Sequence, residues 1–198
     1  NPGNGNDIAD ALAAINATIN RINAIFETDM AITFEIIANT DLVIYNNADT
    51  DPYSPANTGA DGAWNSEVQN TLTSVIGESN YDIGHLFGAS GGNGNANCIG
   101  CVCQNNLKGS AYTSPSNGIP ETDTFDIDFV AHEIGHQMGA NHTWAFESES
   151  TGVNSEPGSG STVMAYAGLE GANNVELNSD VYFHYHSIRQ ILNKLSVK

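Results

Sequence analysis

The chain has 198 residues, 40% of them hydrophobic, which suits one globular domain with a sizeable core. It carries 23 acidic and 5 basic residues, and the formal net charge of −18 disfavours partnership with nucleic acid or an anionic membrane. No apolar run approaches the roughly 20 residues of a membrane helix. The opening NPGNGN shows no apolar stretch typical of a signal peptide, so a secreted form is expected to be the mature one.

The acidic excess has three interpretations. It fits the solubility of a secreted protein, bound calcium, or adaptation to a salty medium, and the last two can coexist. Asp49 and Asp51, in a stretch dense in turn formers, offer oxygen ligands that suit calcium. Because their spacing matches no EF-hand, calcium is a cofactor candidate without a motif.

The N-terminal half alternates predicted helices and strands. Residues 7–26 carry apolar side chains three and four apart, which predicts a helix packed on a sheet. Residues 31–38 and 41–45 are rich in β-branched and aromatic residues and predict strands. A loop of turn formers follows, then a helix over residues 64–76 and a third strand over residues 81–87.

The C-terminal half is less regular. After a glycine- and asparagine-rich loop over residues 88–97, CVC and residues 108–112 are short strand candidates. Residues 123–138 predict a helix entered near Thr124 or Asp126. From Gly139 to about Ser179 we expect mostly irregular chain, and then a final helix ending near Leu195.

The three cysteines, Cys98, Cys101 and Cys103, lie within NCIGCVC. An odd count leaves at least one thiol over, so we expect one short disulfide joining Cys98 to either of the others. A separate metal cluster is the alternative, but no fourth ligand lies nearby.

The run HEIGHQMGANH carries the chemistry. His132 and His136 are four residues apart and share one helix face, and Glu133 sits beside the first of them. Gly139 lets the chain leave the helix sharply, so that His142 can return as a third ligand. Three imidazoles leave a zinc position open to water, whose pKa falls toward about 7. The spacing therefore predicts a catalytic zinc site.

A second segment, STVMAYAG, follows downstream and contains Met164 and Tyr166. Together the two segments resemble the metzincin zinc peptidases, whose signature is HExxHxxGxxH followed by a Met-turn. The flanks are similar to secreted bacterial reprolysin-like, adamalysin-related catalytic domains. Thr143, directly after the third histidine, matches none of the residues that mark the astacin, adamalysin, matrixin and serralysin groups.

The resemblance implies roles for the two downstream residues. Met164 would form a hydrophobic floor beneath the histidines, whereas a methionine alone is usually core filler. Tyr166 would be a switchable zinc ligand that stabilises the oxyanion. The alternative is a half-buried tyrosine whose hydroxyl is hydrogen-bonded elsewhere.

The resemblance also implies the fold. We expect a single α/β catalytic domain over residues 1–198, of the metzincin type of zincin. A twisted mixed β-sheet with packed helices, about residues 1–139, would lie above an irregular C-terminal subdomain, about residues 140–198. The active-site cleft would run between them.

The expected function is that of a secreted, extracellular and monomeric zinc endopeptidase acting on proteins or peptides. His132, His136 and His142 would hold zinc and Glu133 would be the general base. The substrate would lie along a sheet edge, placed near residues 100–110. The alternatives are a zinc- and calcium-bearing binding or adhesion module with incidental catalysis, and a calcium-stabilised structural domain.

Overall fold

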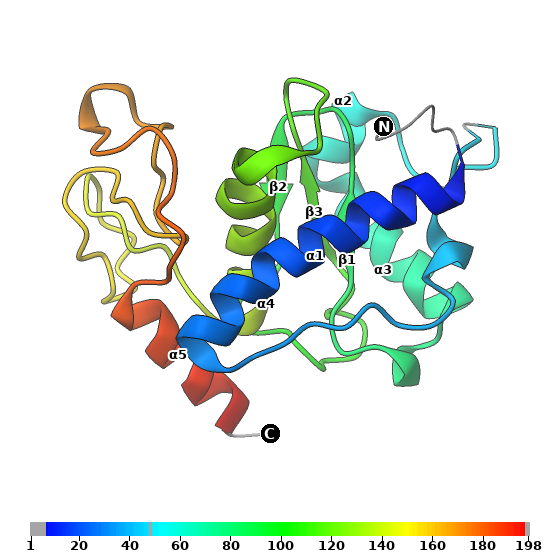
Figure 1. Cartoon of the computed structure of the whole chain (residues 1–198), viewed down its shortest axis with the longest axis horizontal. Helices are drawn as coiled ribbons and strands as arrows, with labels where there is room; N and C mark the ends of the chain where they lie inside the picture. Colours follow the sequence, from blue (N-terminus) through cyan, green and yellow to red (C-terminus); the bar gives the residue numbers. More distant parts are fainter. Residues whose placement is uncertain (1–6, 48, 197–198) are drawn as a thin grey trace.

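The computed structural model describes residues 7–47 and 49–196 (Figure 1). The NPGNGN segment, on which the expectation of a mature form depends, lies outside the described residues. Among the described helices, none combines the length and the apolar character needed to cross a bilayer.

The first helix, α1, runs over Ile8–Met30 and crosses the molecule in front of the sheet (Figure 1). The Asp7 carboxylate caps its first turn by accepting from the Asp10 amide at 2.8 Å. The helix extends four residues beyond the predicted end because its last turn also buries an apolar side chain, Met30. It stops where Ala31 adopts a left-handed conformation with φ 55°.

The prediction of a strand over residues 31–38 is wrong. The segment is extended and its side-chain exposure largely alternates, but it forms no ladder with another strand. The side chain of Asn23 on α1 takes the place of a strand partner. It donates to the Phe34 carbonyl at 2.9 Å and accepts from the Phe34 amide at 2.7 Å. The alternation of side chains along residues 31–38 therefore indicated an extended backbone correctly, but it did not indicate whether that backbone pairs with a strand.

The prediction of a strand over residues 41–45 is also wrong. Thr40–Val43 forms a 3-10 turn, η1, opened by Asn39 in a left-handed conformation with φ 66°. The Leu42 amide donates to the Asn39 carbonyl at 3.1 Å. Local turn chemistry outweighed the β-branched composition here, since asparagine tolerates positive φ better than most residues.

Helical turns then lead to the sheet. The short α2 (Ala56–Thr58) and the π-helical η2 (Gly59–Ala63) precede α3 (Trp64–Val75), which matches the helix predicted for residues 64–76. A 3-10 turn, η3 (Glu78–Asn80), follows.

The sheet is small and mixed. In the described part of the chain its order is β1 (His85–Phe87), β3 (Ala111–Ser114), β2 (Asn93–Asn95). β1 pairs with β3 in parallel and β2 pairs with β3 antiparallel. The strand predicted over residues 81–87 is thus confirmed at its end, and β2 rather than the predicted 100–110 segment forms the edge. CVC lies in a turn.

The helix of the zinc motif is continuous but not uniform. Wide π-helical turns, η4 (Thr124–Ala131), lead into α4 (His132–Met138), which confirms the helix predicted over residues 123–138. Gly139 ends it with φ 122°, a conformation that glycine adopts without the penalty of a Cβ. The exit predicted from the sequence is confirmed.

Beyond Gly139 the chain is irregular apart from the 3-10 turn η5 (Gly171–Asn173) and the final helix α5 (Tyr185–Ser196). This part forms the loops set apart from the sheet in Figure 1, and α5 packs against α4. The main core joins α1, η4, α4, α5 and the segment around Met164 in one cluster. The zinc-motif helix is therefore held on several sides.

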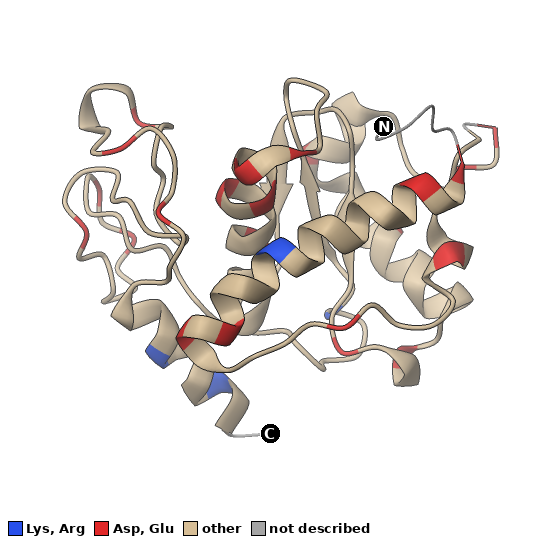
Figure 2. Cartoon of the chain, in the orientation of Figure 1, with Lys and Arg blue, Asp and Glu red and all other residues tan. Residues whose placement is uncertain are grey.

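Acidic side chains are distributed over both parts of the molecule, and two of the few basic ones lie on α5 (Figure 2). Arg21 on α1 forms an ion pair with Asp123 at 2.8 Å. Buried Lys108 lies 3.9 Å from Glu78.

Candidate metal centre and active site

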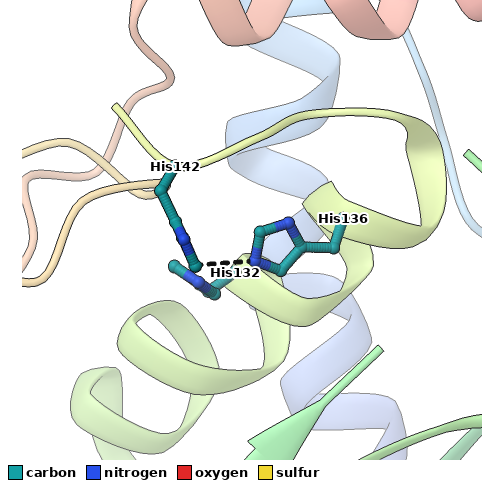
Figure 3. Close-up of side chains that lie close together, drawn as sticks. All are labelled: His132, His136 and His142. Carbon is teal, nitrogen blue, oxygen red and sulfur yellow. Dashed lines mark hydrogen bonds between the residues drawn. The ribbon is translucent and has the colours of Figure 1, made fainter. Parts of the chain in front are cut away.

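His132, His136 and His142 lie together, two from α4 and one from the chain that returns after Gly139 (Figure 3). Their potential ligand atoms all lie within 4.8 Å of one another. Among the residues that the structure describes, they are the one group of three or more histidine, cysteine or acidic side chains placed to hold a metal.

Each imidazole is oriented by a hydrogen bond from Nδ1. His132 donates to the Val163 carbonyl at 2.7 Å, and His136 donates to the Ala140 carbonyl at 2.8 Å. His142 Nδ1 lies 2.9 Å from a carboxylate oxygen of Glu149. Because carbonyl and carboxylate oxygens only accept, Nδ1 carries the proton and Nε2 is the nitrogen left to bind a metal.

The donor set fits zinc. Nε2 of His136 and Nε2 of His142 approach to 3.0 Å, the contact drawn in Figure 3. When both Nδ1 atoms carry protons, both of these Nε2 atoms present lone pairs. Two lone pairs facing each other repel, and a cation between them removes the repulsion. Three neutral imidazoles are the ligand set of a catalytic zinc site.

Glu133 lies beside this group and is 8% exposed. Burial raises the pKa of its carboxyl to about 8, although a hydrogen bond from the Ala96 backbone lowers it. A Cβ placed on Gly94 of β2 would lie 2.5 Å from Glu133 Oε1. The edge strand therefore passes directly over this carboxyl, and a larger residue in place of Gly94 would displace the end of the Glu133 side chain.

Met164 is fully buried against α4. A Cβ on Gly135 would lie 2.3 Å from the Met164 sulfur and 3.2 Å from a ring carbon of Phe183. Gly135 lies within the HEIGH motif, so the glycine lets the methionine approach the helix directly between the two histidines. The motif resemblance predicted that Met164 lies near the histidines, but nothing in the sequence indicated that it packs against Gly135.

Aromatic rings surround the third histidine. The Tyr166 ring lies 4.6 Å from that of His142 and 5.8 Å from that of His132, between centroids. Trp144 stacks on His142 at 5.6 Å. Burial, followed by the carboxylates of Glu133, Glu149 and Glu170, raises the pKa of Tyr166 to about 12. Tyr166 is thus a neutral phenol beside the histidines at any pH near 7.

A family model described as Metallo-peptidase family M12B Reprolysin-like matches residues 5–195. The chain belongs to this family. No curated protein matches the chain. Family membership over nearly the whole length, together with the histidine group, confirms the resemblance on which the fold and the peptidase class were predicted.

Sequence reasoning missed two neighbours of the reprolysin-like site. Glu149 orients His142, and Trp144 stacks on the same ring. Glu149 lies seven residues beyond its partner on an irregular loop, where spacing carries no geometric information. Trp144 lay two residues past the motif, but nothing in the sequence indicated the direction of its ring.

Other predicted features lie elsewhere. Cys98 is joined to Cys101, which confirms one of the two expected pairings, and Cys103 is a free, exposed thiol. Asp51 accepts from the Tyr53 amide at 2.8 Å. Within the described residues, neither Asp49 nor Asp51 belongs to a group of three potential metal ligands, so nothing here supports calcium.

His85 joins the sheet to α4. Its Nδ1 lies 3.1 Å from Gln137 Oε1 and its Nε2 lies 2.8 Å from Thr113 Oγ1. Burial lowers the pKa of His85 to about 4. A neutral imidazole therefore ties β1 and β3 to the zinc-motif helix.

The stability of the zinc-free protein should depend on pH in two opposing ways. Burial lowers the pKa values of His85 and His136 to about 4 and also lowers that of His132. The unfolded chain then binds protons that the folded one does not, so stability falls as pH falls from about 6.5 toward about 4. The raised pKa of Glu133, about 8, acts oppositely: stability falls as pH rises from about 4.5 to about 8.

Thermal unfolding of zinc-free protein across pH 4 to 8.5 checks this prediction. The three histidines together outweigh one carboxyl below about pH 6.5, so we expect maximum stability near that pH. Glu133→Gln should remove the decline above it. An alkaline decline as steep in this variant as in the wild type would contradict the assignment to Glu133.

Proposed function

We propose that this reprolysin-like chain is a secreted, zinc-dependent endopeptidase. One observation carries the proposal: three imidazoles with free Nε2 atoms converge beside the buried carboxyl of Glu133. That combination supplies a metal site and a proton acceptor at the same point. The family supports protein or peptide substrates.

His132, His136 and His142 would hold the zinc ion. When bound, zinc supplies a Lewis acid that polarises the scissile carbonyl and lowers the pKa of a coordinated water. Glu133 would accept the proton of the attacking water and return it to the departing nitrogen. Its position beside the histidines suits it to both steps, because a carboxylate next to a bound cation is held ionised and can then take a proton and release it.

The substrate would lie extended along β2. No described strand pairs with the outer edge of β2, so an extended peptide could add there as a further strand. Gly94 on this strand contacts Glu133, so a peptide paired with β2 would present its backbone next to the base. The substrate-binding edge proposed here is therefore β2, and not the segment near residues 100–110 that was expected from the sequence.

Tyr166 would donate a hydrogen bond to the developing oxyanion. In the described part of the chain, the Tyr166 ring packs against the rings of His132, His142 and Trp144. Tyr166→Phe keeps that packing and removes the hydroxyl, so we expect kcat to fall about a hundredfold with KM little changed. Steady-state kinetics on a fluorogenic peptide measure both constants, and an unchanged kcat would limit Tyr166 to a packing role.

The function itself is tested with an unfolded protein such as casein. We expect cleavage by the untreated protein, none after chelation, and recovery when zinc alone is returned. A peptide library digested in parallel and read by mass spectrometry would define the bonds cut. Intact casein with the zinc-loaded protein would refute the peptidase proposal and favour the alternative of a zinc-bearing binding module.

An extracellular location is supported by the disulfide between Cys98 and Cys101, since such bonds persist in oxidising surroundings. The charge of −18 is compatible with that setting, because strong net charge keeps a protein soluble.

A further inference from the structure

A buried carboxylate outside the histidine group connects the segments on both sides of it. Glu156 is 7% exposed, and its position on the irregular chain between His142 and Met164 gave no sign of a role. Its two oxygens accept hydrogen bonds from hydroxyls and amides of three residues, Thr143, Ser161 and Thr162.

One oxygen faces the third histidine's neighbour. Thr143, which directly follows His142, is fully buried and donates its hydroxyl to Glu156 Oε1 at 2.5 Å. The Thr143 carbonyl accepts from the Glu156 amide at 2.8 Å. The residue after the third histidine is therefore held to Glu156 by both backbone and side chain.

The other oxygen faces the segment that leads into Met164. Glu156 Oε2 accepts from the Ser161 amide at 2.9 Å and from the Thr162 amide at 3.1 Å, and the Thr162 hydroxyl donates to Oε1. The next residue, Val163, supplies the carbonyl that orients His132. Glu156 is thus connected to His132 through the backbone of residues 161–163, which it binds at one end and which orients His132 at the other.

These hydrogen bonds favour the ionised carboxylate. Burial alone would raise the pKa of Glu156, but the Ser161 amide, the two threonine hydroxyls and the Thr162 amide hold it below its ordinary value. The Thr143 amide also donates to the Met164 carbonyl at 3.0 Å, which closes the arrangement into one hydrogen-bonded unit. A charged acceptor at its centre strengthens each of these hydrogen bonds.

We propose that Glu156 is a positioning residue of the zinc site, which holds His142 and the carbonyl partner of His132 in register without contacting either imidazole. The proposal rests on the zinc site proposed above. Outer groups that orient ligands govern how long a metal stays bound, and their loss typically weakens affinity about 10- to 100-fold.

Three variants test this inference. Glu156→Ala leaves the Ser161 and Thr162 amides without their acceptor, and we expect zinc to dissociate about 10 to 100 times faster. Glu156→Gln keeps one oxygen for the amides, while its NH₂ group can donate to the threonine hydroxyls, so we expect a smaller acceleration. Thr143→Val removes one hydrogen bond at nearly constant shape, so it is expected to fold and to accelerate zinc loss several-fold.

The measurement is transfer of zinc from the loaded protein to an excess of a coloured chelator, followed with time. Val68→Ala is the matched control. Val68 is buried in a separate cluster with Leu72 and Tyr81, so this change lowers the melting temperature without touching the site. We expect the control to release zinc at the wild-type rate.

The outcomes separate the two proposals. A wild-type protein that binds no zinc would refute the proposed function. A wild type that holds zinc, with Thr143→Val and Glu156→Gln releasing it no faster, would overturn the positioning role alone. Equal acceleration in Val68→Ala would overturn it as well, because the effect would then follow general stability. If Glu156→Ala does not fold, Thr143→Val decides.

Discussion

Replacing Glu133 with glutamine is expected to remove nearly all peptidase activity while zinc stays bound. General acid–base catalysis contributes about 10²- to 10⁴-fold, so kcat should fall by roughly a thousandfold. Glutamine has nearly the shape of glutamate, which matters because Gly94 of β2 lies against this side chain. The amide cannot take up a proton at neutral pH, and this is the property that the substitution removes.

The comparison requires metal analysis of the same sample used for kinetics. Glu147→Gln is the matched control, since Glu147 is an exposed acid on the loop after the third histidine. It should retain wild-type activity. Near-normal casein cleavage by a zinc-loaded Glu133→Gln protein would overturn the assignment of the base.

Substituting His136 with alanine is expected to abolish tight zinc binding. Structural zinc sites with four ligands bind with apparent free energies of about 10–16 kcal/mol, which amounts to about 3 kcal/mol per ligand and roughly a hundredfold or more in affinity. The loss also leaves the Ala140 carbonyl without the proton of His136 Nδ1. Activity should fall in parallel, because the remaining two imidazoles do not retain the ion.

Competition titration against a chelator of known affinity measures this loss. His184→Ala provides the control, because His184 lies at the start of the last helix, outside the histidine group. The control should bind one zinc ion as tightly as the wild type. Equal affinity in His136→Ala would show that the ion is held elsewhere.

The helices could be predicted because their signals are local. Apolar residues at intervals of three and four set the buried face of α1, and His132 and His136 share a face for the same periodic reason. The end of α1 was not predicted correctly. The helix stops at Ala31, which adopts a left-handed conformation; a glycine at that position would have indicated a helix end, but an alanine does not.

The strands were harder because a strand requires a partner. Residues 31–38 have the alternation of a strand, yet the backbone groups of Phe34 are bonded to the side chain of Asn23. Nothing in the local pattern distinguishes an extended segment paired with a strand from one paired with a helix side chain. Similarly, the sequence placed the sheet edge near residues 100–110, whereas the edge strand next to Glu133 is β2, Asn93–Asn95.

The sequence by itself determined the helical spacing of His132 and His136 and the glycine exit at Gly139, since these depend on neighbours within a few turns. It also determined the family, through motifs that lie in separate segments of the chain. Only the tertiary structure decided which groups orient the imidazoles. The Val163 carbonyl, Glu149 and Glu156 meet the site from irregular chain, where each direction depends on hydrogen bonds rather than on a repeating backbone geometry. Such chain has no period from which a contact can be inferred.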